Sequence, residues 1–101
     1  MEIYQTEMNR GFRVLDGNQK SQVAVMVLEA GEKTGGSENA HINSDQWMYV
    51  VSGQGEATVN EQTVQMKTGS LLLIESGEMH EIRNTGDGPL ETINFYVPPA
   101  Y

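Results

Sequence analysis

Apolar residues along this chain alternate with polar ones or form short β-branched runs, and no stretch keeps the spacing of an amphipathic helix. Gly, Asn, Asp and Ser interrupt the runs at short intervals, which is typical of turns between strands. The pattern predicts eight strands, at Phe12–Leu15, Gln22–Glu29, Gln46–Ser52, Gly55–Val59, Thr63–Lys67, Ser70–Ile74, Met79–Asn84 and Leu90–Val97. This spacing predicts an all-β fold, a single antiparallel β-barrel or jelly-roll sandwich.

The last predicted strand ends at Pro98-Pro99, because proline cannot donate a hydrogen bond to a neighbouring strand. The segment before it is apolar for the end of a chain. Chain ends fray unless side chains dock them. We therefore expect Phe95 and Val97 to pack inward.

Length and composition set the scale of the molecule. A chain of 101 residues with 38% hydrophobic residues fits one globular domain, expected over residues 1–101. The sequence has no cysteine, which excludes disulfides, thiolate metal ligands and a cysteine nucleophile.

The formal charge of −8, from 14 acidic and 6 basic residues, disfavours nucleic acid and anionic membrane surfaces as partners. The segment Met1–Phe12 has no apolar core of signal-peptide length. The longest aliphatic runs, Val23–Leu28 and Leu71–Ile74, are too short to cross a bilayer. We expect a cytoplasmic protein.

Two segments carry the candidate chemistry, and each contains one of the two histidines. The second segment has a defined order and separation of residues: Gly69, five residues, Glu75, one residue, Gly77, two residues, His80, three residues, Asn84. The first segment follows a glycine-rich turn expected at Gly35-Gly36-Ser37, and reads Gly35, five residues, His41, one residue, Asn43, then Gln46, six residues, Gly53.

These segments resemble the two motifs of the cupin family, and the resemblance covers about residues 22–97. Glu75 stands where the second motif usually has proline. The resemblance implies a small single-domain cupin barrel with an internal pocket for a small-molecule ligand or substrate. It implies no nucleotide or organic cofactor.

In cupins the first motif supplies two histidines and a glutamate to a metal ion, and the second supplies one histidine. Carried over, His41 is the first ligand and His80 the last, while Asn43 takes the place of the second histidine and Gln46 that of the glutamate. Imidazole and oxygen ligands suit Mn, Fe, Ni, Cu or Zn, between which the sequence does not distinguish. A site of His41, Gln46 and His80 lacks a carboxylate and its Coulomb attraction, so we expect weak metal binding.

Side-chain alternation leaves two alternatives open. Glu78 shares a face with His80 if the strand has begun by Glu78, and could then supply the missing carboxylate; otherwise it lies in the turn and points to solvent. Alternation from His41 points Asp45 inward, whereas the motif alignment points Gln46 inward.

If Gln46 faces the pocket, then Trp47, Tyr49 and Val51 face outward. Either N-terminal strands cover these side chains or a second subunit buries them. The resemblance to cupins of this size implies a homodimer.

Three functions fit these observations. The first is a metal-dependent enzyme, similar to a dioxygenase, lyase or isomerase. The second is a non-catalytic binding or sensing domain with a degenerate metal site, which the changes at Asn43 and Gln46 favour. The third is metal-free acid–base chemistry by a histidine.

Overall fold

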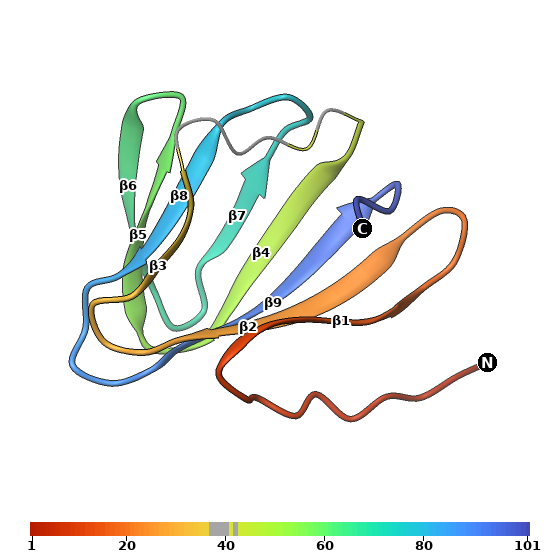
Figure 1. Cartoon of the computed structure of the whole chain (residues 1–101), viewed down its shortest axis with the longest axis horizontal. Coiled ribbons are helices and arrows are strands. Elements are labelled where there is room, and N and C mark those ends of the chain that lie inside the picture. The colour runs from red at the N-terminus through yellow and green to blue at the C-terminus, as the bar shows by residue number, and fades with distance from the viewer. Residues whose placement is uncertain (37–40, 42) are drawn as a thin grey trace.

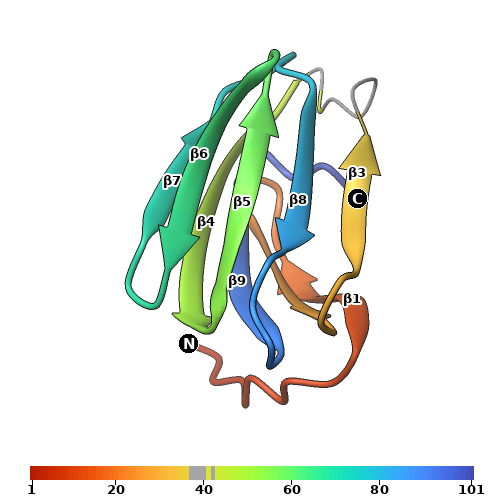
Figure 2. The same ribbon diagram turned by 90° about the vertical axis from the view of Figure 1, so that its left-hand side faces the viewer.

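The computed structural model describes residues 1–36, 41 and 43–101 of the chain. Two antiparallel sheets pack face to face (Figures 1 and 2), with strand orders β1-β2-β9-β4-β7 and β3-β8-β5-β6. The strands are β1 (Gly11–Gly17), β2 (Gln22–Leu28), β3 (Lys33–Gly36), β4 (Asp45–Ser52), β5 (Gln54–Val59), β6 (Gln62–Lys67), β7 (Leu71–Ile74), β8 (His80–Asn84) and β9 (Leu90–Val97). The described residues therefore form an all-β jelly-roll sandwich, as the alternation predicted.

All eight predicted strands are present, with every end within two residues of its predicted position and β9 matched at both ends. The sequence pattern missed β3, which pairs with β8 at the edge of the smaller sheet. Gly35 and Gly36 lie at the end of β3 rather than in the expected turn, and Ser37 lies outside the described residues. Lysine and glycine disfavour strands on their own, so pairing with β8 supplies what propensity does not.

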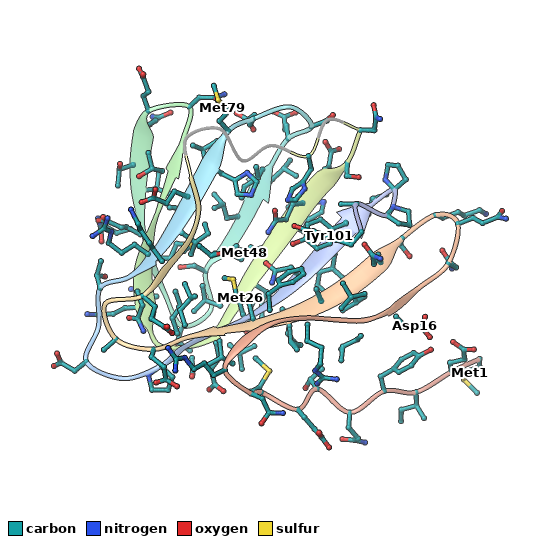
Figure 3. The ribbon with its side chains drawn as sticks, in the orientation of Figure 1. Met1, Asp16, Met26, Met48, Met79 and Tyr101 are labelled. Carbon is teal, nitrogen blue, oxygen red and sulfur yellow. The ribbon has the colours of Figure 1, made fainter. Side chains whose placement is uncertain are left out.

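The core lies between the sheets, where side chains of alternate residues interdigitate. It is a cluster of aliphatic residues and methionines, Met26, Leu28, Met48, Val50, Ala57, Met66, Ile74, Ile82 and Leu90. Met26 and Met48 lie in the space between the two sheets (Figure 3). On β4 the alternation is regular, with Met48 and Val50 buried and Trp47 and Tyr49 exposed.

On β9 the prediction that Phe95 and Val97 pack inward is wrong. Asn94 and Tyr96 are buried, whereas Phe95 and Val97 remain 39% and 47% exposed on the outer face. The inward residues of β9 face the site described below, where polar groups find partners, so apolarity alone gave the wrong face.

Three residues in register cross the inner face of the larger sheet near one end of the sandwich. Tyr96 of β9 pairs with Gln22 of β2 on one side and with Gln46 of β4 on the other. All three are buried. The adjoining rows are mostly aliphatic, so this end of the sandwich is polar and aromatic and the rest is core.

No helix in the described ranges is long and apolar enough to cross a membrane.

Candidate functional site

His41 is held in place by its backbone. Its carbonyl oxygen accepts hydrogen bonds from the backbone N–H of Ser44 at 3.4 Å and of Gly77 at 3.0 Å. The second bond ties the segment before β4 to the turn between β7 and β8. The His41 side chain is half-buried, so it has one face toward the protein and one toward solvent.

His80 begins β8 and its side chain is buried. Its Nδ1 lies 3.1 Å from the backbone carbonyl oxygen of Glu78, a contact that favours the tautomer with the proton on Nδ1. The rings of His41 and His80 lie with centroids 5.1 Å apart at an interplanar angle of 44°. The fold thus brings together two histidines that are separated by 39 positions in the sequence.

Gln46 projects from β4 into the same region and is only 3% exposed. Its Nε2 donates to Asn94 Oδ1 at 3.1 Å, and Asn94 Nδ2 donates to Thr92 Oγ1 at 3.1 Å. This chain fixes the amide orientation. Gln46 Oε1 is buried and accepts no hydrogen bond from any described residue.

The choice between Asp45 and Gln46 is settled by the turn that follows β7. Asp45 Oδ1 accepts a hydrogen bond from the backbone N–H of Ser76 at 2.9 Å, so the carboxylate anchors that turn. Gln46 is the residue that points inward, as the motif alignment indicated and the alternation from His41 did not. The alternation misled because β4 begins only at Asp45, so His41 does not belong to that strand.

Asn43 and Glu78, the two possible further contributors, are not brought into the group. Asn43 is exposed in the turn before β4. Glu78 lies before the start of β8, and its Oε1 accepts from the backbone N–H of Glu75 at 2.7 Å. Its Oε2 accepts from Asn60 Nδ2 at 3.3 Å. The Glu78 carboxylate therefore stabilises the turn.

The two imidazoles are held in their neutral form. Burial lowers the pKa of His41 from its ordinary value of 6.5, and the neighbouring His80 lowers it further. The Gln46 side chain opposes this by raising the pKa of His41, although Oε1 does not reach full hydrogen-bond geometry. Burial also lowers the pKa of His80, against smaller opposing effects of Glu78. At neutral pH both rings therefore keep a lone pair.

Sequence reasoning missed the aromatic residues around His41. The Tyr96 ring lies edge-on to His41 with centroids 5.1 Å apart, and the Tyr101 ring does so at 5.4 Å. Burial, with Tyr101 adding to it, raises the pKa of Tyr96. Tyr96 could have been found from its position two residues after Asn94, because the two side chains share a face of β9. Nothing in the sequence pattern indicates Tyr101.

Comparison with known proteins identifies the family of the chain. The family model for the cupin domain matches residues 24–96. The chain belongs to the cupin family. A Bacillus halodurans protein, BH2720, has a crystal structure that matches this cupin with a TM-score of 0.83 and 28% identity, over 92% of this chain and 74% of that one.

Two curated relatives match over most of this cupin. The uncharacterized protein MJ1618 of Methanocaldococcus jannaschii is 28% identical over 79% of this cupin and 62% of its own length. The tetracenomycin polyketide synthase protein TcmJ of Streptomyces glaucescens is 29% identical over 71% of this cupin and 46% of its own length. The chain thus spans about half the length of the curated relatives it matches.

Cupins often bind transition metals, so the donor set at this end of the sandwich bears on metal binding. Among the described residues, no three His, Cys, Asp or Glu side chains form a group that could hold an ion. The available donors are two neutral imidazoles and the Gln46 amide oxygen, which accepts no hydrogen bond within the described ranges. This set fits a divalent transition ion, and it is weaker than a set that includes a carboxylate.

Proposed function

We propose that this cupin binds a small molecule at the polar end of its sandwich, where His41, Gln46 and His80 meet. The supporting observation is the buried Gln46 Oε1 beside the His41 imidazole, which in turn lies against His80. A buried acceptor without a partner destabilises a protein by about 1–3 kcal/mol. An acceptor of this kind is expected where a bound ion or ligand hydroxyl satisfies it.

In this proposal a divalent transition metal is held weakly by His41, His80 and the Gln46 amide oxygen. When bound, such an ion polarises an oxygen atom of the ligand. Neutral imidazoles are the form that ligates metal, and burial favours that form for both rings. Gln46 is kept in orientation by Asn94, as a ligand that holds an ion must be.

Catalysis is a second candidate. A neutral histidine at a solvent-facing site can accept a proton from a bound molecule, and His41 is half-buried with a lowered pKa. The name of the relative TcmJ assigns that protein to a polyketide synthase, which gives a first class of compounds to screen for turnover. Binding without turnover would leave the first proposal standing alone.

The experiment that tests the proposal is calorimetric titration of chelator-treated protein with Ni²⁺, Zn²⁺ and Mn²⁺. The variants are His80→Ala, Gln46→Glu and, as a control on the exposed face of β6, Gln62→Glu. We expect His80→Ala to abolish binding, and Gln46→Glu to tighten it about tenfold or more because it restores an anionic donor. Gln62→Glu should leave the affinity unchanged.

Equal metal affinities for the wild type and for Gln46→Glu would show that residue 46 does not face the ion. If neither protein binds any of the three metals, the metal part of the proposal is wrong. The organic-ligand part is then tested by titrating small molecules and following the ring resonances of His41 and His80.

We also propose a homodimer formed through the outer face of the larger sheet. That face carries large apolar side chains that are 37–60% exposed: Trp47, Tyr49, Val51, Leu71, Leu73, Phe95 and Val97. Strand register makes them neighbours, since Trp47 lies between Leu73 and Phe95. They expose roughly 500–600 Å² together, taking ~200 Å² for a large side chain. A standard interface needs ~800 Å² per partner, of which somewhat more than half is apolar.

Sedimentation velocity tests the dimer. Phe95→Glu should give a monomer, because a charge at the centre of the face would be buried without a partner. Val64→Glu, at an exposed position of β6 in the other sheet, should remain dimeric. A wild-type protein that sediments as a monomer at 100 μM would contradict the proposal.

A further inference from the structure

Aromatic rings line one side of the histidine pair. Tyr101 lies at their centre, with ring centroids 5.0 Å from Phe12, 5.2 Å from Tyr96 and 5.4 Å from His41. In Figure 3 it lies near the end of β9, at the end of the sandwich away from most of the core. Within the part of the chain that the structure describes, a molecule bound against the exposed side of His41 therefore lies beside Tyr96 and Tyr101.

The hydroxyl of Tyr101 lies 3.5 Å from His41 Nε2, at the long limit of a hydrogen bond. A phenol of this chain therefore already lies where a hydroxyl group of a ligand would reach the imidazole. The contact is longer than the ~2.8 Å of a good hydrogen bond, so a ligand hydroxyl can make a better one. The Tyr101 hydroxyl and a ligand hydroxyl cannot both hydrogen-bond His41 Nε2 at the same time.

The backbone and the side chain of Tyr101 are held very differently. Gln22, which is 8% exposed, donates from Nε2 to the Tyr101 carbonyl oxygen at 2.7 Å. Its Oε1 accepts from the backbone N–H groups of Ala100 at 3.2 Å and Tyr101 at 2.9 Å. Tyr101 as a whole is 59% exposed. Its ring can therefore rotate away from His41 while Gln22 keeps its backbone in position.

The charge around the site restricts the class of ligand. All six lysine and arginine residues of the sequence are exposed. Arg10, Lys33 and Arg83 form ion pairs with glutamates, and Arg13 donates to the Glu7 carbonyl oxygen. Lys20 lies between β1 and β2 and Lys67 ends β6, and no hydrogen bond or ion pair among the described residues joins any of the six to His41, Gln46 or Tyr101. A phosphate or carboxylate group needs a cationic partner when it is desolvated. Neutral imidazoles and aromatic rings instead suit a neutral aromatic ring that carries a hydroxyl group.

We propose that the ligand is a phenolic aromatic compound and that Tyr101 is a built-in occupant of its binding place, which the ligand displaces. This inference rests on the proposed function, since it concerns the same site. Phe12, Gln22 and Tyr101 all lie outside residues 24–96, the segment that the family model matches. The proposed selectivity therefore belongs to parts of the chain beyond the matched cupin segment.

The test is titration of the full chain with 2-naphthol, cyclohexanol and glucose 6-phosphate, for the wild type and for Tyr101→Ala. We expect 2-naphthol to bind Tyr101→Ala about fivefold or more tightly than the wild type, because no ring has to be displaced. Cyclohexanol and glucose 6-phosphate should bind both proteins at least tenfold more weakly than 2-naphthol. Tyr4→Ala, which removes an exposed tyrosine whose hydroxyl contacts Glu2 and Asp16, is the matched control and should bind as the wild type does.

Equal or weaker 2-naphthol binding by Tyr101→Ala would overturn the displacement, and preferred binding of glucose 6-phosphate would overturn the ligand class. A Ni²⁺ titration of the same samples separates this inference from the proposed function. If Ni²⁺ binds the wild type but not His80→Ala while 2-naphthol binds neither the wild type nor Tyr101→Ala, the inference alone fails. If neither Ni²⁺ nor any of the three compounds binds, both fail.

Discussion

Replacing Asn84 with alanine removes three hydrogen bonds at the end of β8 that lies away from His80. Asn84 is 2% exposed, and its Nδ2 donates to the carbonyl oxygens of Leu28 and Gly88, each at 2.8 Å. Its Oδ1 accepts from the backbone N–H of Gly86 at 2.8 Å. At about 1 kcal/mol for each bond, and with buried groups left unsatisfied, the free energy of unfolding should fall by about 3–4 kcal/mol.

Urea unfolding followed by the fluorescence of Trp47, the single tryptophan of the sequence, measures this change. With a slope of about 1.5 kcal/mol per M, a loss of about 3 kcal/mol lowers the urea midpoint by ~2 M. The melting temperature of a chain of this size should fall by roughly 12–30 °C. Because the Asn84 side chain hydrogen-bonds Leu28, Gly86 and Gly88 at the end of β8 opposite His80, the folded variant should keep the Ni²⁺ affinity of the wild type.

Arg83→Ala is the neighbouring control. Arg83 is exposed and approaches Glu56 at 4.0 Å and Glu81 at 3.6 Å, so its loss should change the free energy of unfolding by less than about 0.5 kcal/mol. Asn84→Asp should be at least as destabilising as Asn84→Ala, because a carboxylate would face two carbonyl oxygens. The defect should shrink at low pH, where the protonated acid can donate one bond. A loss below about 1 kcal/mol for Asn84→Ala would refute this account of the three bonds.

Two further predictions concern stability. Because burial lowers the pKa values of His41 and His80, the unfolded chain takes up protons first, so stability is complete above pH ~6.5 and falls as pH decreases below it. Each histidine changes the free energy of unfolding by at most about 1.4 kcal/mol per pH unit. Urea midpoints between pH 7.5 and 5.5 measure the decrease. A double His→Gln variant whose free energy of unfolding depends on pH as steeply as that of the wild type would contradict this account. Gly53→Ala should lower the free energy of unfolding by about 2–3 kcal/mol, because Gly53 has φ +95° and a Cβ there would lie 2.4 Å from the Pro89 carbonyl oxygen. Gly88→Ala, where a Cβ meets nothing within 4 Å, is the control for thermal melts and should change the free energy by less than about 1 kcal/mol in either direction.

The sequence determined the strands with regular alternation and the residues at fixed separations. Alternation made β4 recognisable, and the turn residues that follow it located the start of β5 to within one residue. The spacing around His80 reflects a local arrangement, since Gly77 sits in the turn just before β8 with φ +83°. These features depend on neighbours in the chain, and a sequence pattern can therefore carry them.

The tertiary structure alone decided which alternate side chains of β9 face inward and whether Asp45 or Gln46 enters the site. It alone also showed strand β3. A period of two gives two faces but does not say which is the core when both carry apolar residues, as on β9 with Phe95 outside and Tyr96 inside. Tyr101 reaches His41 only because Gln22, 79 positions away, holds its backbone. Contacts between distant segments depend on how the sheets pack. The local sequence pattern therefore predicted that His41 and His80 belong to one site, but it missed the aromatic residues that lie beside His41.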